Sequence, residues 1–363
     1  MAMEKETLLN LDNGDIVYRQ YDTVVLEFAG KRNVLSSTLF NGGWRDDLQA
    51  VLNHHPAPDE EAKTIEGFWE QNVNLCLKLD YDPVRICALG TGVPMKNVVI
   101  KQAKYDKLKL CAIVTAGVEG NAGRVGDTAS FPALTTNEKL PNGTINIIVY
   151  FDAKLPEGVQ ARALVTATEA KTAALQELMI GSRYSDGLAT GTGTDQIVSI
   201  SNPTASVAIS DCGKHTKPGE LLGKIVKEAV KEAIYKHNGY NGAIMHDVFR
   251  RMQRFGVTKD GLVTEYKSQY GDSVDVAVLY KAMDKLNNTG NAVAVASLCA
   301  HLTDQVNWGL LSADEARAEA DDRLMRLVMD QGVDLSAKKN IIDKWKLAYM
   351  ALLHREVKQC SKK

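Results

Sequence analysis

The sequence of 363 residues is long enough for two domains. Its composition is that of a folded globular protein, and its net charge of -2 argues against a basic surface for nucleic acid. No stretch approaches the roughly 18 apolar residues of a membrane span, and the first ten residues lack the pattern of a secretion signal. The six cysteines are scattered without a CxxC pair, as in reduced cytoplasmic proteins. We therefore expect a cytoplasmic protein without membrane or nucleic-acid partners.

Short β-branched runs, glycine-rich loops and helical patterns alternate from residue 15 to about residue 237. Strands are predicted at residues 16–19, 23–28, 84–89, 110–115, 145–151, 160–167, 196–201 and 206–211, the last four forming two hairpins. Helices are predicted at residues 60–79, at 169–180 with Thr168 as N-cap, and at 216–236 with Thr216 as N-cap. This order indicates an α+β fold, a layered α/β domain with a largely antiparallel sheet.

From residue 239 onward the sequence is typical of one helix after another. Helices are predicted at residues 243–255, 274–286, 292–302, 313–329 and 337–356. Two glycines near residues 237–242 break a long helix, so we predict an α+β domain at 1–238 and an all-helical C-terminal region at 239–363. The apolar faces of this region suit packing over the site, a homo-oligomer interface or a partner, and the sequence does not choose among them.

Four stretches combine glycines with hydroxyl, amide or charged side chains next to predicted strands. They are residues 35–43, 115–127, 189–195 and 213–220. Glycine lets backbone amides approach a ligand closely, and the other side chains supply hydrogen-bond donors and acceptors. One such loop is as readily a tight turn, but four in one domain favour a polar binding site.

These four stretches, together with residues 168–175, resemble the signature segments of the adenosylcobinamide amidohydrolase (CbiZ) family, in the family's order. The resemblance covers about residues 32–236. Two departures are visible: Glu119-Gly120 lengthens the second stretch, and Asn53-His54-His55 stands where the family usually has Asn-His-Gln. The resemblance implies hydrolysis of the amide that joins aminopropanol to a corrin propionate, giving adenosylcobyric acid in corrinoid salvage and cobamide remodelling. It implies a cobalt-containing corrinoid as substrate, and no cofactor is expected to be required.

Amide hydrolysis requires an attacking water or nucleophile, a base, a proton for the leaving amine and stabilisation of the oxyanion. His215 is the predicted general base, because the start of the helix at 216–236 favours a neutral imidazole. The alternative is that His215 only hydrogen-bonds a cap or a ligand. Asp195 is the predicted orienting or second acidic partner, although it suits a turn cap equally well. Asp127 is a further catalytic candidate in the same loops.

The remaining loop residues are predicted to bind substrate: Ser36, Ser37, Asn41, Gly42, Thr115, Asn121, Arg124, Glu169, Lys171, Thr192, Thr194, Lys214 and Glu220. Asn121 and Arg124 would bind the oxyanion or the amides of the ring. Glu220 also fits an ordinary acid in a first helical turn. The hydroxyls of Ser36, Ser37 and Thr115 are possible nucleophiles, but no base is adjacent in sequence, which favours attack by water.

Three other interpretations stay open. A catalytic metal held by His54, His55, His215 and Asp127 is disfavoured, because no HxH or HxxxH pair occurs, and no metal site is predicted. A non-catalytic corrinoid-binding or trafficking protein would use the same loops without cutting the amide. A phosphate or nucleotide enzyme ranks low, because no Walker-type Lys-Ser/Thr follows the third stretch.

Overall fold

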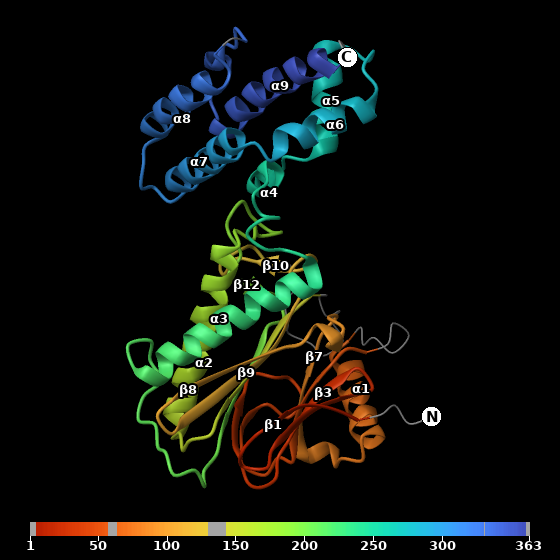
Figure 1. Ribbon diagram of the computed structural model, residues 1–363, viewed down its shortest axis with the longest axis vertical. Coiled ribbons are helices and arrows are strands. Elements are labelled where there is room, and N and C mark those ends of the chain that lie inside the picture. Colours follow the sequence, from red (N-terminus) through yellow and green to blue (C-terminus); the bar gives the residue numbers. More distant parts are fainter. Residues whose placement is uncertain (1–4, 57–63, 130–142, 330, 361–363) are drawn as a thin grey trace. The chain divides into compact units, whose positions relative to one another are not determined.

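The computed structural model describes residues 5–56, 64–129, 143–329 and 331–360 (Figure 1). The chain divides into two compact units, Met1–Asn241 and Gly242–Lys363. The boundary falls at the glycine-rich stretch that ends helix α3, where Gly239 adopts a φ of +74°. This left-handed conformation strongly favours glycine and closes the helix with a backbone hydrogen bond to Tyr235.

Unit 1 contains two large sheets and a short two-stranded ribbon. Sheet A has the order β1-β2-β3-β6-β7, sheet B the order β5-β4-β13-β11-β9-β8, and the ribbon pairs β10 with β12. The strands are β1 (Glu6–Asn10), β2 (Ile16–Gln20), β3 (Thr23–Glu27), β4 (Asn33–Ser36), β5 (Gly43–Arg45), β6 (Ala50–His54), β7 (Ile86–Gly90), β8 (Val99–Tyr105), β9 (Leu108–Ala116), β10 (Ala122–Gly123), β11 (Ile145–Phe151), β12 (Gly191–Thr192) and β13 (Gln196–Ser201). The β6–β7 and β11–β13 ladders are parallel and the other ladders antiparallel, so the largely antiparallel α+β prediction is confirmed.

The two sheets pack face to face, and helices cover their outer faces (Figure 1). The helices are α1 (Ile65–Lys78), α2 (Glu157–Glu177) and α3 (Lys217–Asn238), with short 3-10 turns η1 (Pro83–Arg85) and η2 (Met95–Asn97). Val51 of sheet A and Ile113 of sheet B share the core between the sheets. On the outer face of sheet A, Phe68 of α1 packs with Leu52. Helices α2 and α3 contact sheet B, which gives the layer order helix, sheet, sheet, helices.

Helix α3 follows its sequence closely. Its apolar stripe, including Leu222, Val226 and Val230, is buried. The Thr216 hydroxyl accepts a hydrogen bond from Gly219 N at 3.2 Å, and Pro218 occupies the first turn, where no amide proton is needed. The predicted helix and its N-cap are therefore confirmed.

Both predicted hairpins with residues 160–167 and 206–211 are wrong. Residues 160–167 lie inside α2, where Thr168 donates to the Leu164 carbonyl at 2.8 Å instead of capping a helix. Small alanines at helical spacing, among them Ala163, Ala167 and Ala174, are buried along one face, and this weak apolar signal hides the helical period. Residues 206–211 form one isolated bridge, between Lys154 and Ala208, and no strand. The predicted helix at 60–79 is described only from Ile65, since residues 57–63 lie outside the described part.

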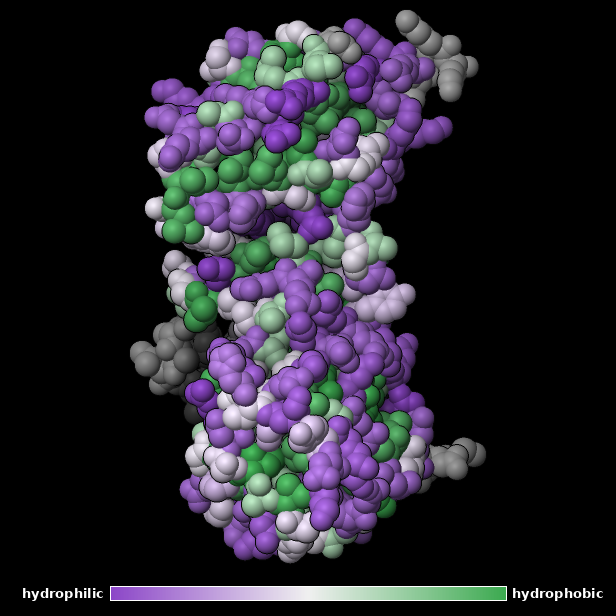
Figure 2. Space-filling model, turned by 60° about the vertical axis from the view of Figure 1, so that its left-hand side comes forward, coloured by the Kyte–Doolittle hydropathy of each residue, from purple (hydrophilic) through white to green (hydrophobic). Residues whose placement is uncertain are grey.

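Unit 2 is helical, as predicted. Its elements are α4 (Val248–Met252), η3 (Gln253–Phe255), α5 (Lys259–Tyr270), α6 (Val276–Asn287), α7 (Gly290–Asn307), α8 (Ala313–Leu327), η4 (Leu335–Ala337) and α9 (Ile341–Cys360). Helix α5 was not predicted, because polar residues and Gly261 interrupt its short apolar pattern. Trp345 and Tyr349 stack within a core of their own. No helix among the described residues is long and apolar enough to cross a membrane. Figure 2 shows a largely hydrophilic surface with smaller hydrophobic areas.

Candidate active site

The two ends of the sandwich in unit 1 carry different polar groups. At one end β6, β7 and β9 finish and β11 and β13 begin, since Asn146 of β11 lies opposite Thr115 of β9 and beside Gln196 of β13. The second and third glycine-rich stretches leave the sheet here, and we call this the loop end. At the other end β8 turns into β9 after Tyr105, and we call this the hairpin end.

Three fully buried side chains join the sheets at the loop end: Asn53, Thr115 and Asn146. Asn53 Nδ2 donates to Thr115 Oγ1 at 2.9 Å, and Asn146 Nδ2 donates to Asn53 Oδ1 at 2.8 Å. Asn146 Nδ2 also donates to the carbonyl oxygen of Gly90 at 3.0 Å. We call this trio the amide network. Because buried amides are costly unless paired, it fixes how the sheets meet.

Thr115 was predicted as a site residue, whereas the role of Asn146 was missed and Asn53 was noted only within a departure from the family run. A signal was present in the sequence. Each asparagine interrupts an apolar strand, after Leu52 in one case and between Ile145 and Ile147 in the other. An amide in such a strand is buried and needs a partner.

Asp195 anchors the third stretch and has no capacity left to orient an imidazole. Its carboxylate accepts from Lys171 Nζ, from Thr192 N at 2.9 Å, from Thr192 Oγ1 at 2.5 Å and from Ile145 N at 2.9 Å. The side chains of Lys171 and Asp195 are 8% and 10% exposed. Gly191 is required beside them, since a Cβ there would lie 2.3 Å from Asp195 Oδ2. Asp195 and Lys171 therefore form a nearly buried ion pair that holds the loop onto α2.

Asn121 and Thr194 hold the second and third stretches together. Asn121 Nδ2 donates to the Gly143 carbonyl at 3.1 Å, and Thr194 Oγ1 donates to the same oxygen at 2.8 Å. Tyr184 OH donates to Asn121 Oδ1 at 2.7 Å. The amide of Asn121 is thus occupied at both ends within the fold.

Asp127 fixes a turn in the second stretch. Its Oδ2 accepts from Arg124 N at 2.8 Å and from Ser182 Oγ at 2.5 Å. Burial opposes its negative charge, but hydrogen bonds from Ser182, Ser185 and Arg124 outweigh burial and lower the pKa of Asp127. The Arg124 side chain donates to the Leu188 carbonyl at 3.3 Å. Asp127 is therefore an ionised anchor at neutral pH.

The first stretch crosses between the sheets and is tied to them by its own polar groups. Ser37 Oγ accepts from Ile197 N at 3.0 Å, and Ser36 Oγ donates to Thr38 Oγ1 at 2.9 Å. Asn41 Nδ2 donates to the carbonyls that precede and open β7, at 2.8 and 2.7 Å. A Cβ on Gly42 would lie 2.0 Å from the Thr38 carbonyl oxygen. The hydrogen bonds of Ser36, Ser37 and Asn41 therefore hold the first stretch in place between the two sheets.

Lys214 of the fourth stretch contacts the face of α2 that is turned away from Asp195. Lys214 Nζ binds Glu169 at 2.9 Å on the exposed face of α2, whereas Lys171, two residues along, points inward to Asp195. Side chains two residues apart on an α-helix project about 200° apart, so α2 separates exposed His215 from Asp195.

The neighbours of His215 lie near the hairpin end. Lys217 Nζ lies 5.3 Å from the centre of the Tyr105 ring. Glu220 pairs with Lys217 at 2.6 Å and with Lys224 at 2.5 Å, as an ordinary acid of the first turn. The expectation that all four stretches converge on one site, with His215 beside Asp195, is thereby corrected.

Other histidines do lie at the loop end. His55 Nδ1 lies 2.7 Å from Asp22 Oδ2, although 33 residues separate them in the chain. His237, near the end of α3, packs so closely on Gly117 that a Cβ there would lie 3.1 Å from its ring. Burial lowers the pKa of His237, and the charges of Glu119 and His55 also act on it.

A pocket of about 300 Å³ lies between α1 and the loop end of sheet A. Thr23, His54, His55, Glu70, Gln71 and Lys78 are among the residues that line it. His54 is 3% exposed, and its buried ring interacts with the Asn72 side chain of α1. Burial lowers the pKa of His54 to about 4, so its ring is neutral at pH 7.

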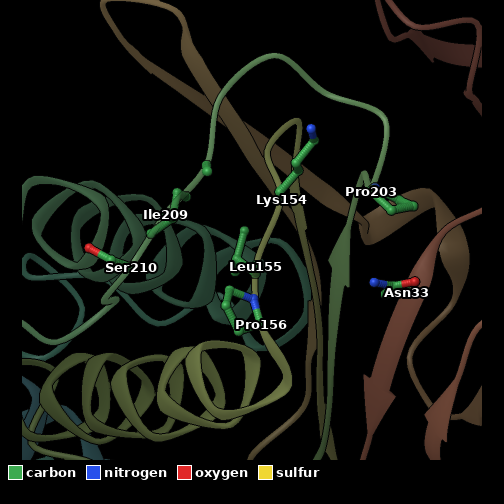
Figure 3. Close-up of a pocket in the computed structure, with 8 residues that line it drawn as sticks. Asn33, Lys154, Leu155, Pro156, Pro203, Ile209 and Ser210 are labelled. Carbon is green, nitrogen blue, oxygen red and sulfur yellow. The ribbon is translucent and has the colours of Figure 1, made fainter.

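Figure 3 shows another pocket, of about 460 Å³, at the end where β11 and β13 finish. Leu155, Pro156, Pro203 and Ile209 give it an apolar wall, and Lys154 is its only ionisable lining residue. It brings no acid and base together. Over residues 5–56, 64–129, 143–329 and 331–360, no three His, Cys, Asp or Glu side chains are grouped to hold a metal ion.

Comparison with known proteins identifies the family. Residues 8–242 match the family described as adenosylcobinamide amidohydrolase, CbiZ. An uncharacterized protein of Methanocaldococcus jannaschii is 33% identical over 238 residues, which are 62% of this chain and 90% of that protein. A crystal structure from Pyrococcus horikoshii aligns with 65% of this chain and 81% of its own, at 12% identity and a TM-score of 0.29. The family match spans the sandwich and ends beside the unit boundary, and the chain belongs to the adenosylcobinamide amidohydrolase (CbiZ) family.

Proposed function

We propose that this protein hydrolyses the amide that joins aminopropanol to the corrin ring of adenosylcobinamide, releasing adenosylcobyric acid and aminopropanol. The observation that carries the proposal is the family match over residues 8–242, which begins inside β1 and includes the second and third glycine-rich stretches. In this role the corrinoid is the substrate, and the protein acts in corrinoid salvage and cobamide remodelling.

The polar groups of the loop end support this chemistry. Hydrolysis of an amide needs a base for the attacking water and donors that stabilise the oxyanion. The loop end gathers the amide network, His54, His55 and His237 at the border of a hydrophobic sandwich. The hairpin end offers His215 among exposed lysines and glutamates.

The residues proposed from sequence take different parts in this arrangement. Asn121, Arg124, Thr192 and Thr194 belong to the loops through which a corrinoid would be held. The ionic and hydrogen-bonded anchors Asp127, Asp195 and Lys171 shape those loops. Glu169 of α2 pairs with Lys214, which precedes His215 in the chain, and Glu220 lies in the first turn of α3.

Incubation of the full-length protein with adenosylcobinamide tests the proposal, with mass spectrometry of the products. Adenosylcobyric acid and aminopropanol in equal amounts would support hydrolysis. Tight binding without either product would instead support the non-catalytic corrinoid-binding alternative. Heat-denatured protein controls for spontaneous hydrolysis.

A further inference from the structure

We propose that Tyr184 binds the adenosyl group of the substrate by stacking its ring on the adenine, and that it thereby makes the protein prefer adenosylated corrinoids. This inference rests on the proposed function, because the substrate of that reaction supplies the adenine. Tyr184 lies just before the third glycine-rich stretch, and no sequence pattern marked it as a site residue. Its fixed position, its exposure and its contacts with the family loops carry the assignment.

The backbone around Tyr184 is a closed turn over residues 182–187. An isolated antiparallel bridge closes the turn, and inside it Ser182 N donates to the Gly187 carbonyl at 2.8 Å. Ser182 Oγ accepts from Tyr184 N at 3.0 Å and donates to Asp127 Oδ2 at 2.5 Å. The backbone that carries Tyr184 is therefore held by the second glycine-rich stretch as well as by its own turn.

The ring of Tyr184 is fixed at its tip and along one side. Its hydroxyl donates to Asn121 Oδ1 at 2.7 Å, and the amide of Asn121 is itself anchored to the Gly143 carbonyl at 3.1 Å. One side of the ring lies against Gly123, where a Cβ would lie 3.3 Å from Tyr184 Cδ2. A side chain that is already ordered loses little rotamer entropy when a ligand binds, so this ring is pre-organised for a contact.

Tyr184 stays exposed despite these contacts. The residue is 53% exposed, although its hydroxyl and one side of its ring are occupied. Val125, two residues after Gly123, is 83% exposed, and its backbone N donates to Thr190 Oγ1 at 2.9 Å. A single exposed apolar side chain is ordinary on a protein surface. Here, however, the second and third stretches both present one on an anchored backbone, which suits a surface that a ligand covers.

The adenine is the part of the substrate that suits this ring. Adenosylcobinamide, which the family description names, carries an adenosyl group, and its adenine is a flat aromatic base. The corrin ring carries methyl groups and amide arms on saturated carbons at its rim, which hinder a flat contact. Stacking of a base on an aromatic side chain needs only a free ring surface and is typically worth about 10-fold in affinity. The free surface of Tyr184 offers such a contact.

Two corrinoids that differ in the adenosyl group test the assignment with the full-length protein. Adenosylcobinamide carries the adenine and dicyanocobinamide does not, so binding of each is titrated and turnover of each is measured. Tyr184→Ala should raise Kd and KM for adenosylcobinamide about 10-fold with little change in kcat, and should leave Kd for dicyanocobinamide within about twofold of the wild-type value.

Further variants separate the ring from its hydroxyl and from the fold. Tyr184→Phe keeps the ring and loses the hydrogen bond to Asn121, so it should retain most of the affinity for adenosylcobinamide. Tyr105→Ala is the matched control, because Tyr105 is 55% exposed but lies at the hairpin end, and both corrinoids should bind this variant as they bind the wild type. If Tyr184→Ala is unfolded by circular dichroism, Tyr184→Leu replaces it with the same expected result.

The outcomes separate adenosyl recognition from the reaction. If Tyr184→Ala weakens binding of both corrinoids by the same factor, or of neither, Tyr184 does not recognise the adenosyl group, and hydrolysis by the wild type still stands. An equal loss in Tyr184→Phe would assign the effect to the hydroxyl and overturn the stacking. If the wild type binds adenosylcobinamide without cleaving it, the hydrolysis is overturned and the two Kd ratios still decide the role of Tyr184. A wild type that binds neither corrinoid overturns both proposals.

Discussion

The two ends of the sandwich in unit 1 use similar residue types for different purposes. At the loop end, charged and amide side chains are buried and paired across long separations, as in Lys171–Asp195 and Asn53–Thr115. Near the hairpin end, a lysine and a glutamate meet on an exposed helix face, as in Lys217–Glu220. Buried polar groups constrain structure and shift protonation, while exposed ion pairs are screened by water. The difference teaches that a glycine-rich stretch indicates function only when its polar groups converge in the fold.

The largest effect on stability is expected from breaking the buried ion pair. Lys171→Met leaves the Asp195 carboxylate nearly buried and without its cation, and should lower the free energy of unfolding by about 3–5 kcal/mol. Lys214→Met removes an exposed cation, from the stretch before α3, that pairs with Glu169 of α2, and should cost at most about 1 kcal/mol. Urea unfolding of both variants measures this contrast. Equal losses would contradict the distinction between the buried and the exposed ion pair.

The free energy of unfolding should depend on pH because the His54 ring is held neutral in the folded protein. Its pKa is lowered by burial from 6.5 to about 4, so the unfolded chain binds more protons than the folded one between these values. At about 1.4 kcal/mol per pKa unit, stability contributed by neutral His54 should fall by about 3 kcal/mol as the pH drops from 6.5 to 4.

Denaturant unfolding across this pH range checks the prediction. His54→Gln cannot titrate there, so the wild-type slope should exceed that of the variant. Parallel slopes for the two proteins would show that His54 is not held neutral by the fold.

A smaller loss of stability is expected when a side chain of the amide network is replaced. Asn146→Leu removes the donor to Asn53 and Gly90 and leaves buried acceptors unpaired, at a cost of about 1–3 kcal/mol. Ser199→Ala in neighbouring β13 is the matched control, because Ser199 is equally buried but its hydroxyl has no partner among the described residues. If both substitutions cost the same in thermal unfolding, the network does not join the sheets.

The smallest effect is expected at His215, beside the exposed face of α2. His215 is exposed and separated by α2 from Asp195, so His215→Ala should leave stability unchanged and kcat/KM within about threefold. Side-by-side assays of His215→Ala and the wild-type protein with adenosylcobinamide measure this. A loss of more than about threefold at His215 would return the chemistry to the fourth stretch.

Parts of the fold were predictable because their signals are local. The strand at 145–151 and helix α3 carry continuous apolar patterns, and Thr216 caps α3 as its residue type favours. Helix α2 was misread over residues 160–167, because its buried face is built of alanines that barely differ from a polar background. Strand propensity is weak evidence where tertiary packing selects a helix.

For the candidate site, the sequence alone determined that polar, glycine-rich loops follow apolar strands and that the family segments occur in order. Only the tertiary structure decided which loops share an end of the sandwich. Asp22 and His55 meet because β3 pairs with β6, and Asn53 meets Asn146 because two sheets pack face to face. Lys214, which precedes His215, pairs with Glu169 on the exposed face of α2, whereas Lys171 on the other face pairs with Asp195. The sequence gives the chemical type of each side chain directly. Distances between residues far apart in the chain depend on strand register and on how the layers pack, and no local sequence pattern encodes these.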